Sequence, residues 1–300
     1  MCLIYLAWRA HPRFDLVVAA NRDEWHARKA APVAWWDDAP RVLAGRDMEA
    51  GGAWMGVARP LMSDRRLRFA AITNYREIPI APGSPGHDPP SDALPAPPSR
   101  GELVLDFLAG GEGRLDSAFD YSREVHRKGR RYRGFCLLVM DDAGLYFVSN
   151  RGAQPYPLAP GVYGLSNHLL DTPWPKVIQG KDEMRRLLRS PHSELCDFFS
   201  LLTSRAIPPD ACLPDTGVGI ERERFLSPRF IVGDDYGTRA STVLCLKADG
   251  SGSMTERRFG ALGNFEDERV FRIDRAGAIE RSPKGDREKG VDPPTRSQVS

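Results

Sequence analysis

The sequence of 300 residues has few of the residues that build disulfide frameworks and metal sites. Its five cysteines are widely separated and form no CxxC pair, and its six histidines form no HxxxH or HExxH pattern. An odd number of scattered cysteines supports neither a disulfide framework nor a thiolate metal site. We therefore expect a reduced protein without a metal centre.

The sequence also lacks a surplus of either charge and any long apolar run. Its 42 basic and 40 acidic residues give a formal charge of +2, whereas nucleic-acid-binding proteins usually carry a basic surplus. No apolar run approaches the roughly 18 residues that span a bilayer. The first apolar segment, 2–8, has neither the basic flank nor the cleavage site of a signal peptide. We expect a cytoplasmic protein with no membrane span and no nucleic-acid partner.

What the sequence does contain is an order of strands, then helices, then strands. This order, rather than regular alternation of strand and helix, predicts an α+β sandwich of antiparallel sheets covered by helices. We expect the first two strands, 2–8 and 16–20, to form a hairpin, because His11-Pro12 lies between them as a turn signal. The other expected strands are 54–58, 69–73, 135–140, 145–148, 242–247 and 254–258. One helix is expected to begin near residue 99, and three more are expected at 118–126, 181–189 and 193–203.

We expect a single domain of residues 1–274, with two segments that lack regular structure: a loop within the domain and a tail after it. Residues 79–98 contain eight prolines in twenty positions, which excludes a helix or a central strand and predicts a surface loop without a catalytic task. Residues 275–300 are charged, contain proline and have almost no large apolar side chains, so we expect a disordered tail.

Cys2 is the first candidate for chemistry. Removal of the initiator Met would leave a cysteine with a free α-amine, whose pKa of about 7.7–8.0 lies near that of a thiol, about 8.5. The amine could then act as the general base for its own thiol. The simpler interpretation is that Cys2 is a small buried apolar residue.

The segment Asn21-Arg22-Asp23-Glu24 directly follows the second strand. In the expected hairpin, Arg22 and Asp23 end the strand that pairs with the strand starting at Cys2. An aspartate there can hold an α-ammonium group, and an arginine beside the sulfur favours the thiolate. Polar residues at a strand end are also commonly just a turn.

This segment is one of six that resemble the NRDE family, also called the transport and Golgi organisation protein 2 family. The resemblance runs in order from residue 1 to about residue 245. The main departures from the family are residues 79–98 and the tail, and both lie outside every motif. The other five motifs are GGAWMGV at 51–57, AITNYR at 71–76, SRGELV at 99–104, GLSN at 164–167 with DTPWPK at 171–176, and YGTRAST at 236–242.

That family in turn resembles the N-terminal nucleophile hydrolases of the cysteine type, which implies a four-layer αββα fold. The resemblance implies that Cys2 is the nucleophile, that Arg22 lies beside its sulfur and that Asp23 orients the amine. It implies further that Asn167 and Asn74 donate to an oxyanion and that Arg239 completes the network.

Two of these residues also have ordinary structural interpretations. Asn167 could form a turn before residue 171, and Arg239 could pair with Asp234 or Asp235.

Two functions follow from the resemblance. The first is an amidohydrolase that cleaves a small linear amide through an acyl-thioester on Cys2 and needs no cofactor. The second is a non-catalytic carrier of haem or of an acyl or lipid ligand in the same pocket, with His26 or His168 as candidate haem ligands. An interaction module with a vestigial site is a third alternative, and the oligomeric state is open.

Overall fold

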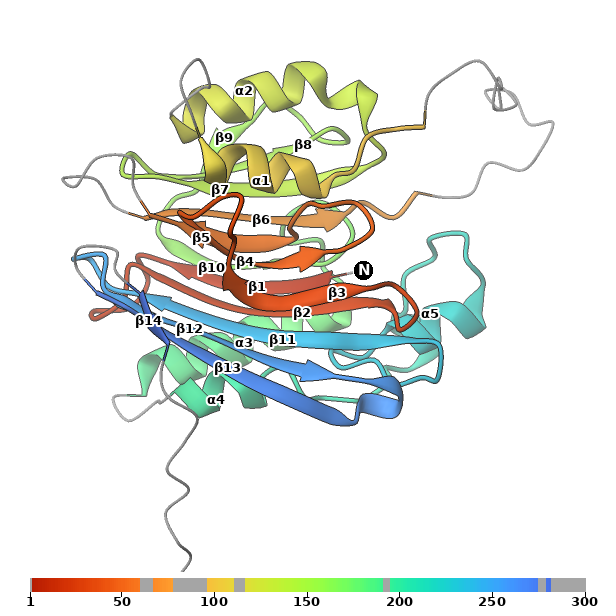
Figure 1. The fold of residues 1–300 in the computed structure, drawn as a ribbon. Coiled ribbons are helices and arrows are strands. Elements are labelled where there is room, and N and C mark those ends of the chain that lie inside the picture. Colours follow the sequence, from red (N-terminus) through yellow and green to blue (C-terminus); the bar gives the residue numbers. More distant parts are fainter. Residues whose placement is uncertain are drawn as a thin grey trace, which may run out of the picture.

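Two seven-stranded antiparallel sheets stack face to face and carry helices on their outer faces (Figure 1). The computed structural model describes residues 2–59, 67–77, 96–110, 117–190 and 195–274, together with a short strand at 279–281. The layers therefore run helix, sheet, sheet, helix. This confirms the expected α+β sandwich with four αββα layers.

The first sheet contains both ends of the described chain. Its central strands are β1, β2 and β11, so the expected hairpin of the first two strands lies in the middle of this sheet. In spatial order its strands are β10 (Gly161–Leu165), β1 (Cys2–Trp8), β2 (Leu16–Trp25), β11 (Tyr236–Leu246), β12 (Gly252–Phe259), β13 (Phe265–Ile273) and β14 (Ile279–Arg281).

The second sheet is a simple meander in which each strand pairs with the next one in the sequence. Its strands are β3 (Ala30–Trp35), β4 (Val42–Asp47), β5 (Met55–Ala58), β6 (Arg68–Asn74), β7 (Phe135–Met140), β8 (Leu145–Ser149) and β9 (Tyr156–Pro157).

Helices cover both outer faces. The apolar stripe predicted after residue 99 lies in α1 (Gly101–Ala109), which packs with α2 (Ala118–Lys128) on the second sheet. The helices α3 (Pro175–Arg189) and α4 (Leu195–Ser200) pack on the first sheet. Shorter helical segments are α5 (Ile220–Leu226) and the 3-10 turns Gly129–Arg131, Asp210–Cys212 and Ala261–Gly263.

β1 is buried on both faces, and its alternation separates two cores. Ile4, Leu6 and Trp8 enter the core between the sheets, whereas Leu3 and Tyr5 pack toward the helices α3 and α4. Successive side chains of a strand point to opposite faces. The sequence of a strand in the middle of such a sandwich is therefore one continuous apolar run, as it is in residues 2–8.

Several strands were not predicted from the sequence. β3 and β4 contain residues that disfavour a strand assignment, Pro32 in β3 and Gly45-Arg46-Asp47 at the end of β4. β13 is largely exposed and rich in charged residues, so it has no apolar run to indicate a strand. The three residues of β14 pair with β13 inside the range expected to be a disordered tail. The remaining tail and most of the proline-rich stretch, 79–95, lie outside the described residues.

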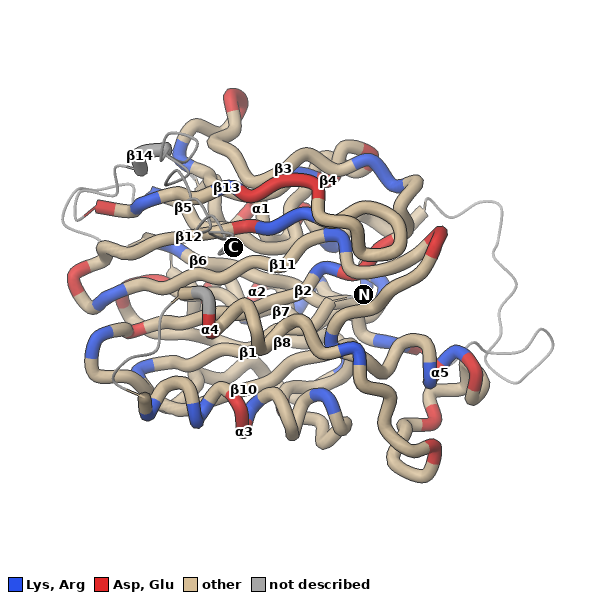
Figure 2. Tube along the Cα trace, turned by 90° about the horizontal axis from the view of Figure 1, so that it is seen from below, with Lys and Arg blue, Asp and Glu red and all other residues tan. Residues whose placement is uncertain are grey.

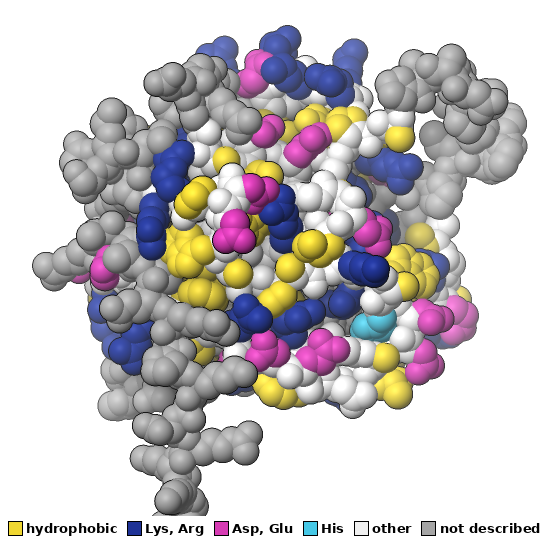
Figure 3. Space-filling view, in the orientation of Figure 1, with side chains coloured by type: hydrophobic (Ala, Val, Ile, Leu, Met, Phe, Trp, Pro, Cys, Tyr) yellow, Lys and Arg dark blue, Asp and Glu magenta, His cyan; other side chains and the backbone are white. Residues whose placement is uncertain are grey.

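Charged side chains are spread over the layers rather than gathered on one element. In Figure 2 basic and acidic positions are scattered over the trace, and Figure 3 shows both signs interspersed with apolar side chains on one face. No helix in the described part of the chain is long and apolar enough to cross a bilayer.

The contact between α3 and β1 generates a testable prediction. Alanine at Gly180 would ordinarily favour a helix by about 1 kcal/mol, but its Cβ would lie 2.1 Å from the ring of the fully buried Tyr5. We expect Gly180→Ala to lower the free energy of unfolding by about 1–3 kcal/mol in urea titrations. Gly144→Ala is the control, because its Cβ would have no contact closer than 3.5 Å. Equal stability of the two variants would contradict this account.

Candidate active site

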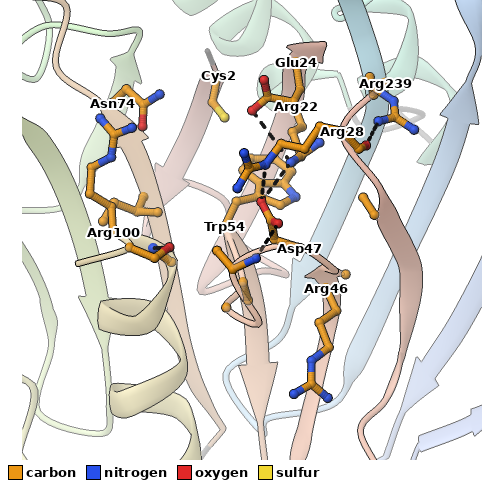
Figure 4. Close-up of a pocket in the computed structure, with 18 of the residues that line it drawn as sticks. Cys2, Arg22, Glu24, Arg28, Arg46, Asp47, Trp54, Asn74, Arg100 and Arg239 are labelled. Carbon is orange, nitrogen blue, oxygen red and sulfur yellow. Dashed lines mark hydrogen bonds and ion pairs between the residues drawn. The ribbon is translucent and has the colours of Figure 1, made fainter. Parts of the chain in front are cut away.

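A cavity of about 620 Å³ opens between the two sheets at the end where β1 begins. Cys2 and Arg22 enter it from the first sheet, and Ile72 and Asn74 enter it from β6 of the second sheet. The loop 50–54 and residues 96–101 form further walls. The close-up in Figure 4 shows the Cys2 sulfur between Arg22 on one side and Asn74 with Arg100 on the other.

The pairing of β1 with β2 places Cys2 directly opposite Arg22. Directly opposed residues in an antiparallel pair project to the same face of the sheet. Along β2, Val18 and Ala20 point into the core between the sheets. Arg22 and Glu24 continue this alternation and point to the same side. The expected proximity of Cys2 and Arg22 is therefore present in the fold.

Cys2 is a buried thiol at the wall of the cavity, with 8% of its surface exposed. Burial, together with the charges of Asp23 and Glu24, raises its pKa to about 11, against the opposing charges of the N-terminal ammonium group and Arg22. The thiol is therefore protonated at neutral pH in this environment. A reaction at its sulfur needs a base.

The alternate residues of the same segment point to the opposite face of the sheet. The side-chain amide of Asn21 donates to the carbonyls of Leu202 and Arg229 at 3.0 and 2.7 Å and accepts a hydrogen bond from Ser241 at 2.6 Å. Asn21 thus ties β2 to β11 and to the loop after α4. Its role is structural.

Asp23 also lies on this outward face, although it borders the end of the cavity. Burial raises the pKa of its carboxyl group, against the charges of the N-terminal ammonium group and Lys176 and a 2.7 Å hydrogen bond from Thr238. The ammonium group of Lys176 is buried as well, which lowers its pKa to about 8, and it donates to the carbonyl of Leu226. Asp23 is therefore held by a buried polar network at the end of the cavity, where its charge also acts on the Cys2 thiol.

Asn74 and Asn167 are linked, but only Asn74 lines the cavity. The side-chain amide of Asn167 donates to the backbone carbonyl of Asn74 at 3.1 Å. Its own carbonyl accepts from the backbone N–H of Arg76, and its φ of 54° is the left-handed conformation that asparagine tolerates in turns. Asn167 thus supports the position of Asn74 from outside the cavity.

Arg239 lines the cavity but is engaged with the backbone. Its guanidinium donates to the carbonyls of Trp25 and Arg28, which hold the turn between β2 and β3. No ion pair joins it to Asp234 or Asp235 among the described residues. Its Nε atom is buried and has no hydrogen-bond partner in the described part of the chain.

The histidines considered as haem ligands lie elsewhere. His168 bonds to the hydroxyls of Tyr75 and Thr172, each at 2.8 Å, and neither it nor His26 lines the cavity. Within the described ranges no group of three or more His, Cys, Asp or Glu side chains could hold a metal ion. Cys2 is the one side chain among the described cavity residues that is soft enough to ligate a haem iron.

Comparison with known proteins shows the family to which this chain belongs. A family model described as "Transport and Golgi organisation 2" matches residues 1–261. The chain belongs to this family.

Curated relatives are similar over most of their length. "Transport and Golgi organization protein 2 homolog" from Bos taurus is 33% identical over 281 residues, which is 86% of this chain and 92% of the bovine protein. The homolog from Homo sapiens is 30% identical with the same coverage. "Transport and Golgi organization protein 2" from Drosophila melanogaster is 26% identical over 207 residues, 65% of this chain and 67% of that protein.

The fold of this Transport and Golgi organisation 2 family member explains two motifs through one close contact. A Cβ atom on Gly52 would lie 2.5 Å from the backbone carbon of Gly101, and the N–H of Ala53 donates to the Gly101 carbonyl at 3.2 Å. The GGAW loop and the start of α1 therefore touch backbone to backbone. This contact places Arg100 of the SRGELV motif in the cavity wall, a position that its local sequence does not indicate.

Glu256 is a further buried carboxyl group that lines the cavity of this family member. Only 3% of its surface is exposed, and it accepts a 2.9 Å hydrogen bond from the backbone N–H of Val33. Burial raises its pKa to about 6, against the N–H bond from Val33 and the charges of Arg258, Arg269 and Arg22.

This carboxyl group predicts a pH dependence of stability. Its pKa is raised above the ordinary 4.5, so the folded protein binds the proton more tightly than the unfolded chain does. Its stabilising contribution is thus present below about pH 4.5 and is lost as the pH rises through about 6. Glu256→Gln removes this titration and keeps an acceptor for Val33.

We expect the free energy of unfolding of the parent, relative to Glu256→Gln, to fall by about 2 kcal/mol between about pH 4 and pH 7. Urea unfolding at constant ionic strength measures this difference. A difference that does not change with pH would contradict the assignment.

Proposed function

We propose that this protein is an N-terminal cysteine hydrolase that cleaves a small linear amide. The observation that carries the proposal is the placement of Cys2 at the start of β1, at the wall of a cavity and directly opposite Arg22. The four-layer fold supports it, since the cysteine-type N-terminal nucleophile hydrolases have the same layers. The proposal places the protein in the cytoplasm, where aminopeptidases would remove the initiator Met and expose the α-amine of Cys2.

The reaction would proceed in two balanced steps. The α-amine takes the thiol proton, the sulfur attacks the amide carbon, and a C–S bond forms. The C–N bond then breaks, and the leaving amine carries the proton away. Water attacks the resulting thioester, which releases the carboxylic acid and restores the thiol. The free amine is needed as the base because the buried thiol, with its pKa of about 11, is otherwise protonated.

The oxyanion formed in these steps needs donors close to the Cys2 sulfur. The side chain of Asn74 lies across the cavity from Cys2 and is the candidate donor (Figure 4). Asn167 holds the Asn74 backbone and acts through it rather than as a donor itself. A preorganised donor of this kind reduces the barrier by roughly 3–4 kcal/mol.

The measurement that tests this proposal is intact mass spectrometry of protein made without an N-terminal tag. We expect loss of Met1 and, after exposure to activated amides, an acyl adduct that maps to Cys2. Cys2→Ala should form no adduct and lose turnover to background. Cys212→Ala should behave as the parent, because Cys212 is an exposed free thiol that does not line the cavity. Retained Met1, or an adduct unaffected by Cys2→Ala, would refute the mechanism.

A second candidate function is a carrier that binds haem or an acyl ligand in the same cavity without turnover. The observation in its favour is the arginine-rich wall of the cavity, to which Arg22 and Arg100 contribute. Arginine side chains could pair with haem propionates. Cys2 would then be the axial ligand, since His26 and His168 do not line the cavity.

Haem titration separates this candidate from the hydrolase. If the cavity carries haem on the cysteine sulfur, the parent shifts the haem absorbance band and Cys2→Ala binds at least about tenfold more weakly. His168→Gln should bind as the parent does. If Cys2→Ala and His168→Gln both bind haem as tightly as the parent, the haem binds elsewhere and Cys2 is excluded as its ligand.

A further inference from the structure

The cavity concentrates positive charge in a chain whose overall charge is nearly balanced. Seven of the described lining residues are arginines and four are acidic, against 42 basic and 40 acidic residues in the whole sequence. Low-dielectric walls focus the field of such a cleft and attract ions of the opposite sign. The consequence depends on which of these arginines are already neutralised.

Three of the arginines have close partners of their own. Arg28 pairs with Asp47 at 2.7 Å, and Arg46 pairs with Asp38 at 2.6 Å. Arg239 donates to backbone carbonyls at the turn after β2. These three side chains build the wall of the cavity.

Arg22 is less well neutralised. Its nearest carboxylate oxygens belong to Asp47 and Glu24, at 3.6 and 3.8 Å, which is longer than a hydrogen bond. Asp47 is shared with Arg28. Only 11% of the Arg22 side chain is exposed, so water screens its charge weakly.

Arg100 lies across the cavity with a neutral partner. Its guanidinium donates to the carbonyl of Gly134 at 3.1 Å. Burial lowers its pKa, and the charge of the nearby Arg133 acts in the same direction. No carboxylate pairs with Arg100 or Arg133 among the described residues. Two like charges close together at the cavity wall are unfavourable until an anion joins them.

We infer that the ligand of this cavity carries a carboxylate or phosphate group that binds between Arg22 and Arg100, beside Cys2. The inference rests on the proposed function for the cavity being the substrate site, and it adds the charge class of the substrate. A guanidinium group can bind either anion through two parallel N–H donors. Arg100 is then the residue that selects anionic over neutral ligands.

Matched probes test the charge class directly. The carboxylate pair is N-hexanoylglycine and its neutral glycinamide, and the phosphate pair is N-hexanoyl-phosphoethanolamine and its neutral ethanolamide. Calorimetry on the Cys2→Ala protein measures affinity without turnover. We expect at least one anionic probe to bind about tenfold more tightly than its neutral partner, as a charge-assisted contact would give. The pair that shows this preference identifies the anion.

Variants locate the selectivity. Arg100→Gln should reduce the preference to less than about twofold, and Arg100→Lys should retain part of it because lysine keeps the charge without the planar donors. Arg46→Gln is the matched control, since it removes the same charge from the wall but from a side chain paired with Asp38. Circular dichroism confirms that each variant is folded.

The outcomes separate this inference from the proposed hydrolase. Three results would overturn it. The first is equal affinity for the anionic and neutral probe within both pairs, and the second is an equal effect of Arg100→Gln and Arg46→Gln. The third is no binding of either anionic probe or of inorganic phosphate. Preferential binding of an anionic probe without acylation or turnover in the Cys2 protein would leave the inference standing and refute hydrolysis. Turnover of neutral amides with no preference for anions would do the reverse.

Discussion

The antiparallel pairing of β1 with β2 is the constraint on which the candidate site depends. It sets Cys2 against Arg22, and the period of two along β2 then assigns every residue of the NRDE segment to a face. Arg22 and Glu24 face the cavity, while Asn21 and Asp23 lie on the opposite face of β2, where Asn21 bonds to the carbonyl of Leu202 and Asp23 lies near Lys176 of α3. A shift of one residue in the pairing of β1 with β2 would exchange the two faces and place either Asn21 or Asp23 opposite the Cys2 thiol.

The burial of both faces is what fixes this register. Apolar side chains of β1 fill the inter-sheet core on one side and the helix layer on the other, so neither face tolerates exchange. The same burial has a chemical consequence at the strand end. It keeps the Cys2 thiol neutral, and the charges of Arg22, Asp23 and Glu24 act on the thiol more strongly than they would in water.

Features that depend on residues close together in the sequence could be predicted, whereas features that depend on distant residues could not. The hairpin that joins Cys2 to Arg22 is local, so turn signals and apolar runs were enough to predict it. The position of Arg100 depends on the backbone contact between Gly52 and Gly101, two residues far apart in the chain, and no local pattern encodes it. Likewise, the side chain of Asn167 donates to the backbone carbonyl of Asn74 across the sandwich, and a sequence motif does not determine the direction in which an amide points.

The electrostatics of the cavity bear on how a nucleophile could arise in it. An adjacent arginine ordinarily favours a thiolate, yet here burial outweighs Arg22, whose charge is shared with Asp47 and Glu24. An anionic ligand between Arg22 and Arg100 would draw their charge further from the sulfur. The cationic wall is therefore better suited to holding a ligand than to ionising Cys2. A base at the chain terminus, and not the arginines, would have to remove the thiol proton, which makes exposure of the α-amine the step on which catalysis in this cavity depends.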